Sequence, residues 1–231
     1  MKLAVHQPHY LPWLGYLAKW AAADVLVFLD TVQYEKNGWQ NRNRIRTPGG
    51  AQWLTVPVHA HLGTPICHVS VDTTQPWRAR HLRAIEHAYA RAPHLASHHE
   101  GLRALLDVPW ARLADLAVAS ATWLAGAIGI TTPTRLASSL RVDGDDASGR
   151  LVEICKAVGA DTYLAGAHGA NYMDAERFRA AGITVLYQDY EHPVYPQQHG
   201  EFVPFLSGVD LLLTHGDESL PILRRGDHWC R

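Results

Sequence analysis

Hydrophobic and polar positions alternate in blocks along the first forty residues, and these blocks predict a compact structural unit. The apolar run 2–5 predicts a strand, residues 17–23 predict one or two helical turns, and the β-branched run 24–30 predicts a second strand. A polar loop interrupted by prolines, residues 6–16, separates the first strand from the helix. A strand, loop, helix, strand unit normally aligns its strands in parallel, so this loop should lie at the carboxyl edge of the sheet, where α/β proteins bind ligands.

The same succession recurs in the second half of the chain, between residues 162 and 187. A short apolar strand leads into the small-residue loop 166–172, which is followed by a helical segment and another apolar strand. Gly166, Gly169 and Ala170 permit close approach of the backbone to a ligand, and amides at a helix start favour an anion. We therefore expect this loop to face the first one across a cleft.

The segments between these units predict a mixed structure with a helical centre. Apolar residues recur with helical spacing through about 77–129, whereas residues 52–58 and 66–72 resemble strands and residues 33–44 a functional loop. After a further strand at 130–140, a polar loop precedes a helix at 149–158, with Ser148 as its expected N-cap.

Together these elements predict an α/β fold with a mostly parallel central sheet of about five strands and an inserted helical block at about 77–129. Residues 1–220 should form a single domain, in which Ser207 caps a last helix at 208–213. The remaining residues, 221–231, should form a peripheral tail.

Composition narrows the classes of protein that are possible. The chain of 231 residues has a formal charge of −1 and no apolar run long enough to cross a bilayer, and its start does not resemble a signal peptide, so we expect a cytoplasmic protein. Arg42, Arg44 and Arg46 suit one phosphate or carboxylate better than a nucleic-acid duplex. The three cysteines are too far apart for a disulfide framework or a metal pair, and no metal site is expected.

Two sets of residues, one in each half of the chain, resemble the WbqC-like protein family over roughly residues 1 to 220. They are His6-Gln7-Pro8, Tyr10, Pro12-Trp13, Gly15-Tyr16, Asp30, Gln33, Asn41-Arg42-Asn43 and Trp53 to Pro57 in the first half, and Tyr163 to Gly166, Tyr172, His192 to Gln197, Phe202 to Pro204, Ser207 to Leu212 and Gly216 in the second. The resemblance implies a role in O-antigen, other sugar or natural-product assembly. It leaves the chemistry to be read from the residues.

The spacing His6-x-x-His9 after a first strand also resembles the HxGH element of the nucleotidyltransferase-like (HUP-type) superfamily. There the two imidazoles contact phosphates, which implies ATP with magnesium as a cofactor. Pro8 stands where that element has glycine, and no KMSKS-like element is found at 141–150.

The candidate site residues are those that follow predicted strands or carry the resemblance. His6 would polarise a phosphate or carbonyl oxygen, Asp30 would accept an amine proton or orient His6, and Arg42 would hold an anionic group. All three should line one pocket, because each follows a strand. Substrate-binding residues would be Gln7, His9, Tyr10, Trp13, Gln33, Asn41, Asn43, Tyr172, His192, Tyr195 and Gln197, and Gly166, Gly169 and Ala170 would bind the cofactor phosphate.

These residues favour two classes of function. The first is an enzyme that forms an amide or ester by acyl or aminoacyl transfer to an amino sugar or similar small amine, with ATP or an acyl-carrier or aminoacyl conjugate as donor. The second is a non-catalytic partner of an assembly enzyme that binds a sugar nucleotide or glycan. A thiol mechanism at Cys155 is disfavoured, because this cysteine lies among apolar residues within a predicted helix.

Overall fold

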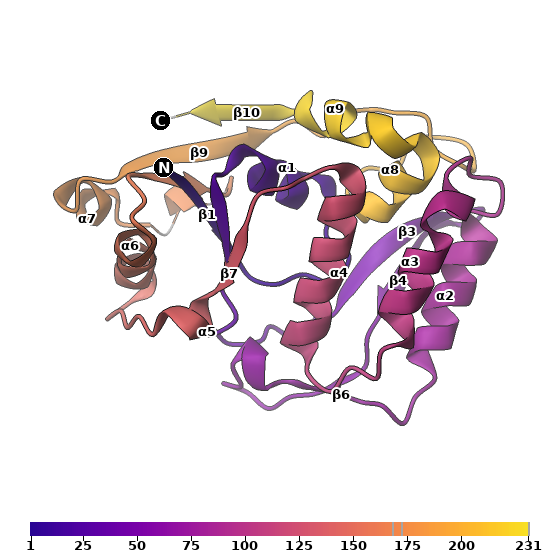
Figure 1. The fold of residues 1–231 in the computed structure, drawn as a ribbon, viewed down its shortest axis with the longest axis horizontal. Coiled ribbons are helices and arrows are strands. Elements are labelled where there is room, and N and C mark those ends of the chain that lie inside the picture. The colour runs from indigo at the N-terminus through magenta and orange to yellow at the C-terminus, as the bar shows by residue number, and fades with distance from the viewer. Residues whose placement is uncertain (168, 172, 231) are drawn as a thin grey trace.

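The fold is organised around a central sheet, against which helices pack (Figure 1). The computed structural model describes residues 1–167, 169–171 and 173–230, and in these residues the central sheet has six strands. Their spatial order is β10 (Asp227–Cys230), β9 (Thr184–Tyr190), β8 (Thr162–Ala165), β1 (Lys2–His6), β2 (Val25–Phe28) and β7 (Thr134–Leu136). The predicted α/β class with a mostly parallel sheet is confirmed.

The strand order defines where a ligand site is expected. All neighbouring strands are parallel except β9 and β10. Counted in chain order, the parallel strands β7, β2, β1, β8 and β9 stand in the order 3-2-1-4-5, which is typical of doubly wound sheets. The order reverses between β1 and β8, and ligands of such sheets bind outside the carboxyl ends of the strands at this reversal.

Helices cover both faces of the sheet because the strand residues alternate between two apolar cores. Ala4 of β1 packs in one core with α1 (Leu14–Ala22), whereas its neighbours Leu3 and Val5 face the other core. The first core also contains residues of the insertion and of the C-terminal helices α8 (Gly208–His215) and α9 (Ser219–Arg224). The second core is covered by α5 (Ala137–Leu140), α6 (Ala147–Val158) and α7 (Ala175–Ala180).

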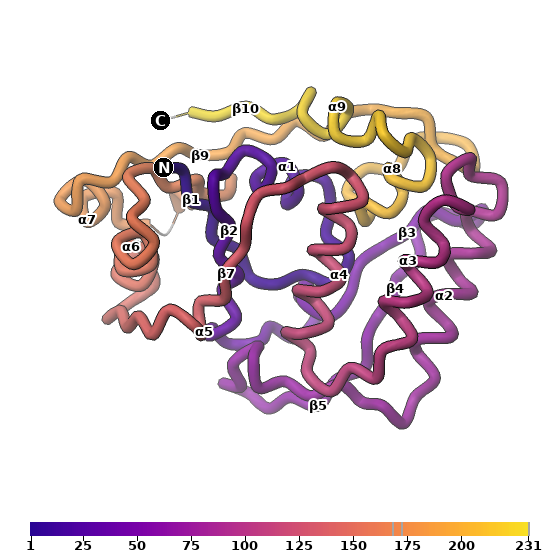
Figure 2. Tube along the Cα trace, viewed as in Figure 1, coloured from indigo at the N-terminus to yellow at the C-terminus, as the bar shows by residue number. Residues whose placement is uncertain are grey.

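A long insertion separates β2 from β7, and its path can be followed in Figure 2. The three helices predicted for 77–129 are present, but strands and a 3-10 turn precede them. The insertion comprises β3 (Arg42–Thr47), β4 (Gly50–Thr55), β5 (Val58–His59), η1 (Ile66–His68), β6 (Ser70–Val71), α2 (Trp77–Ala88), α3 (Leu95–Asp107) and α4 (Leu113–Ile128). The hairpin β3–β4 begins within the predicted loop 33–44, and the predicted strand 66–72 is reduced to β6, because η1 turns the chain first.

Two expectations about element ends change. Asp146 rather than Ser148 caps α6: its carboxylate accepts a hydrogen bond from the amide of Gly149 at 2.7 Å, while Ser148 Oγ accepts from the amide of Asp174. Ser207 caps α8 as predicted. Residues 221–231, expected to be a peripheral tail, contribute the end of α9 and the edge strand β10, which pairs antiparallel with β9. A short 3-10 turn, η3 (Gly216–Glu218), joins α8 to α9.

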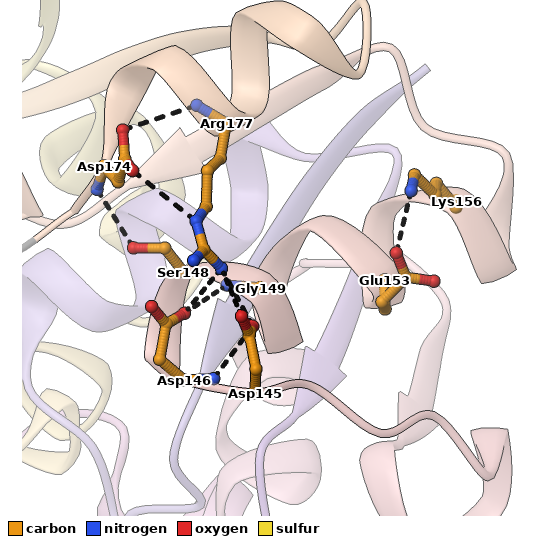
Figure 3. A network of polar contacts seen from close by, with 8 residues as sticks. All are labelled: Asp145, Asp146, Ser148, Gly149, Glu153, Lys156, Asp174 and Arg177. Atoms are coloured by element: carbon orange, nitrogen blue, oxygen red, sulfur yellow. Dashed lines mark hydrogen bonds and ion pairs between the residues drawn. The ribbon is translucent and has the colours of Figure 1, made fainter.

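The loop before α6 is tied to α7 by one arginine (Figure 3). Arg177 Nη1 lies 2.8 Å from a carboxylate oxygen of Asp145 and 3.2 Å from one of Asp146, and its Nε lies 3.5 Å from Asp174. These side chains are largely exposed to solvent, so the ion pairs contribute only modestly to stability. The contacts nevertheless engage the carboxylates of Asp145 and Asp146 in the loop before α6. They also fix the start of α6, which forms part of the cleft described below. No helix in the described residues is long and apolar enough to span a membrane.

Candidate functional site

A cavity of about 670 Å³ opens at the carboxyl edge of the sheet, where the strand order reverses. Residues from the loop after β1 and from the loop after β8 line it together. The first loop and α1 contribute His6, Gln7, Trp13, Gly15, Tyr16 and Lys19, and the second loop contributes Gly166, Ala167 and Gly169. The two loops therefore meet across one cleft, as the sequence predicts. We call this cavity the cleft.

Gly15 allows the wall of the cleft to form. A Cβ atom at this position would lie 2.2 Å from the ring of Trp13, so only glycine lets the indole pack against the start of α1. Trp13 in turn contacts the rings of Tyr190 and Phe205, at centroid distances of 5.7 and 5.6 Å. These three rings form an aromatic end of the cleft, suited to a sugar or nucleoside face.

Two histidines and a tyrosine form a tight ring cluster beside the cleft. The His6 centroid lies 4.7 Å from that of His9 and 4.1 Å from that of Tyr16. His6 Nδ1 is 3.1 Å from the carbonyl oxygen of Gln7. Because a carbonyl only accepts, Nδ1 must carry the proton, and Nε2 of the neutral ring keeps its lone pair. His9 is 7% exposed, and its Nδ1 has no hydrogen-bond partner within the described residues.

Burial and neighbouring charge keep these imidazoles neutral. Burial, then the charge of Lys19, lowers the pKa of His9 to about 3. The same two causes, with a smaller effect of His9, hold the pKa of His6 well below its usual value. The unprotonated ring offers a nitrogen lone pair near pH 7, although its lowered pKa makes it a weaker base than an ordinary histidine.

Lys19 lines the cleft, although the sequence did not predict it as a site residue. It lies on α1, one turn beyond Tyr16, is 4% exposed, and donates a hydrogen bond from Nζ to the carbonyl oxygen of Val5 at 3.0 Å. Burial lowers its pKa to about 7, so part of the population is uncharged at neutral pH. The signal in the sequence was a lysine between the apolar residues Ala18 and Trp20, since lysine is seldom fully buried without a role.

Further residues of the cleft come from elements that the prediction did not connect with the first loop. Arg150 reaches it from α6, Glu35 from the segment after β2, and Gln188 from β9. Gln188 donates from Nε2 to the carbonyl oxygen of Gly15 at 3.1 Å, which joins the edge of the sheet to the start of α1.

Asp30 and Arg42 do not share the cleft with His6, which corrects the expectation of one pocket for all three. The Asp30 carboxylate accepts hydrogen bonds from the amide and the hydroxyl of Ser138, at 2.9 and 2.6 Å. The reason is topological: β2 and β7 are adjacent parallel strands, so the residues that follow them meet. Arg42 lies at the start of β3 and lines a different cavity.

The predicted substrate-binding residues of the first half divide into three groups. Gln7 and Trp13 line the cleft, and His9 lies directly behind it. Gln33 and Asn41 line the second cavity with Arg42.

The third group, Tyr10 and Asn43, is buried and structural. Tyr10 Oη pairs with His81 Nδ1 at 2.9 Å, and Asn43 Nδ2 donates to the carbonyl oxygen of Leu11 at 2.7 Å. Asn43 thus holds the backbone of the first loop from below rather than facing a ligand.

The predicted substrate-binding residues of the second half are also mostly structural. The Tyr195 hydroxyl donates to buried Asp210, and Gln197 both accepts from the amide and donates to the carbonyl of Val203. His192 stacks beside Tyr195, at a centroid distance of 6.3 Å, and is not among the residues that line the cleft. Tyr172, the remaining predicted residue, lies outside the described residues.

The small-residue loop contacts the cleft without forming the expected phosphate cradle. Gly166 and Gly169 line the cleft, whereas Ala170 is exposed and does not line it. The amide of Gly169 donates to the carbonyl oxygen of Gly166 at 2.8 Å, so it is already engaged. No group of three or more His, Cys, Asp or Glu residues that could hold a metal occurs in the described part of the chain.

Cys155 is buried in α6, and its thiol is not activated as a nucleophile. Burial raises the pKa of its thiol to about 12, which keeps it protonated at neutral pH. Cys155 is not among the residues that line the cleft.

The fold and the cleft define an α/β protein with a doubly wound sheet and a ligand-sized cavity at the reversal of strand order. The chain belongs to the WbqC-like protein family, whose model matches residues 7–222. It is similar to the uncharacterized protein Rv1507c of Mycobacterium tuberculosis, with 34% identity over 235 residues that cover all of this chain and 99% of the relative. No solved structure matches the chain.

Proposed function

We propose that the protein transfers an acyl or aminoacyl group to the amine of a small hydroxylated acceptor, such as an amino sugar, in glycan or natural-product biosynthesis. The observation that carries this proposal is the setting of His6: a neutral imidazole with its Nδ1 proton directed at the Gln7 carbonyl, in a cavity of about 670 Å³ at the carboxyl edge of β1. The free lone pair on Nε2 lets this ring accept a proton from an acceptor nitrogen, and a bound anion beside it would raise its pKa toward the working pH.

In the proposed reaction the acceptor nitrogen attacks the acyl carbon of the donor. The new N–C bond forms while the bond from the acyl carbon to the leaving group breaks, and the leaving group takes the electron pair. His6 Nε2 accepts the proton lost by the nitrogen and returns it to the leaving group or to solvent. Proton transfer of this kind typically contributes about 10²–10⁴-fold in rate.

The cations of the cleft favour an anionic activated donor. Lys19 and Arg150 line it from α1 and α6, and the aromatic end offers a surface for a planar ring. These features suit ATP, which when bound supplies the activation of a carboxyl group, and equally a carrier-bound aminoacyl donor. The 3-2-1-4-5 strand order supports a HUP-type relationship. Among the described residues that line the cleft, Glu35 is the only carboxylate, so magnesium would arrive with the phosphates.

The test is direct detection of the amide. The protein is incubated with D-glucosamine and either ATP, magnesium and an amino acid or an aminoacyl conjugate, and mass spectrometry follows the condensed product. We expect product with the native protein and with Cys155→Ala, and product formation at least about 10²-fold slower with His6→Gln. Binding of sugar nucleotides without product from either donor would instead favour the non-catalytic binding role.

A further inference from the structure

A second cavity, of about 950 Å³, adjoins the cleft. It is lined by the segment 33–42 and by residues of the insertion that follow β4. Glu35 lines both cavities, so they meet at this residue. The second cavity is larger than the cleft, and the donor in the proposed reaction does not occupy it.

The segment 37–42, which lines the second cavity, is held in place by several contacts. Arg42 Nε donates to the carbonyl oxygen of Gly38 at 3.3 Å, its Nη2 donates to the carbonyl of Asn37, and its guanidinium lies 4.2 Å from the ring centroid of Trp53. Gln40 Nε2 donates to Gln7 Oε1 at 2.7 Å, which ties this segment to the first loop of the cleft. Arg42 therefore secures this segment, and its donors are directed at the backbone.

The lining of the second cavity combines the cations Lys36 and Arg42 with several hydrogen-bond acceptors. Asn41 is 6% exposed, and its Nδ2 donates to the carbonyl oxygen of Val56 at 2.8 Å. Its Oδ1 has no partner among the residues that the structure describes. The carboxylates of Glu35 and Asp72 add further acceptors, and hydrogen bonds from Thr74 and Gln75 lower the pKa of Asp72, which keeps it anionic. Such a lining suits a ligand that carries an ammonium group and hydroxyls.

We propose that this second cavity is the acceptor site, which binds a hydroxylated primary amine with its ammonium group against Glu35 at the junction with the cleft. The inference rests on the proposed function, because a transfer between two substrates needs two sites that meet. The donor would occupy the cleft beside Lys19 and Arg150, and the acceptor would enter from the side of Asp72 and Asn41. The ammonium group would give one proton to the Glu35 carboxylate, and the free amine would then reach the donor at the boundary of the two cavities.

Binding of D-glucosamine and 2-aminoethanol to the uniformly ¹⁵N-labelled full chain, followed by amide chemical shifts and isothermal titration, tests the acceptor site without any transfer reaction. We expect the largest shifts at Tyr34, Asn41 and Val58. Glu35→Gln should weaken binding by about tenfold or more, because a charge-assisted contact is lost. D-Glucose, which lacks the amine, should bind more weakly than D-glucosamine.

Two control variants separate the sites. Glu100→Gln removes a carboxylate whose side chain is 80% exposed on α3 and should leave binding unchanged. His6→Gln alters the cleft and should also preserve amine binding while it slows transfer by at least about 10²-fold. No binding of either amine at millimolar concentration, or equal binding by native protein and Glu35→Gln, would overturn the acceptor site. Amine binding that depends on Glu35, without product from any donor, would refute the transfer reaction and leave the acceptor site standing.

Discussion

The cleft and a buried group formed by Tyr89, Tyr195 and Asp210, which we call the network, both contain tyrosines and ionisable side chains. They differ in what these side chains contact. In the network, Asp210 accepts from the hydroxyls of Tyr89 and Tyr195, at 2.8 and 3.0 Å, and every one of these groups is buried. In the cleft, His6 and Lys19 are each held by one backbone carbonyl and border an open cavity. Residue type alone does not distinguish binding from structure; the hydrogen-bond partners do.

The same contrast applies to the electrostatics of the two regions. Burial raises the pKa of Asp210 in the network, and two tyrosine hydroxyls compensate by donating to it. In the cleft, burial lowers the pKa of Lys19 to about 7, and the single hydrogen bond to Val5 leaves most of the cost uncompensated. An uncompensated buried charge beside a cavity is typical of functional sites.

The largest expected effect concerns His6 in the cleft. His6→Gln should lower the rate of transfer by at least about 10²-fold, because glutamine cannot accept the proton. The melting temperature should stay close to that of the native protein, since His6 is only half-buried and makes one hydrogen bond. Single-turnover kinetics and calorimetry measure the two quantities. Full activity in a folded His6→Gln protein would remove His6 from the mechanism.

The network should respond in stability rather than activity. Asp210→Ala leaves the hydroxyls of Tyr89 and Tyr195 without their acceptor and should lower the free energy of unfolding by about 3 kcal/mol. Urea denaturation measures this loss, with the exposed Asp189→Ala as the matched control. We expect ligand affinity of the folded fraction to be unchanged. A selective loss of affinity would instead assign the network to the binding site.

Lys19 should reveal itself through the pH dependence of stability. Its folded pKa of about 7 lies below the usual value of 10.5, so the unfolded chain binds more protons between these values and stability rises with pH across that window. Between about pH 7 and 9 this lysine should contribute a gain of about 2 kcal/mol, by the linkage relation. The penalty is complete below pH 7.

Lys19→Met should abolish that gain, while Lys156→Met, at an exposed position on α6, should behave like the native protein. Urea denaturation at several pH values measures the difference. Identical pH profiles for native protein and Lys19→Met would mean that the buried amine titrates normally.

The smallest effect is expected at Cys155, which separates the core from the cleft. Cys155→Ala should retain full turnover and lose about 1 kcal/mol of stability, as a small truncation in the core. Activity assays and urea denaturation of the purified variant provide the check. An inactive but fully folded Cys155→Ala protein would restore the thiol mechanism.

Local patterns in the sequence were sufficient for the class of fold and for the position of the cleft. The apolar runs at β1, β2 and β8 predicted parallel strands, and the loops that follow β1 and β8 meet as expected. The helices at 77–129 followed from spacing alone. These features depend on the periodicity of neighbouring residues, which is visible in a single sequence.

Only the tertiary structure decided which side chains share a site. Asp30 pairs with Ser138, 108 residues away, and Gln188 with Gly15, 173 residues away, and neither pairing has a local signal. Lys19 enters the cleft because α1 packs on the sheet, and Arg42 leaves it because β3 begins a separate hairpin. The sequence by itself determined most strands of the central sheet, the helices of the insertion and the edge of the sheet at which the cleft opens. Hydrogen-bond partners depend on how distant elements of the chain pack. The assignment of residues to the cleft, the second cavity and the network therefore required the folded chain.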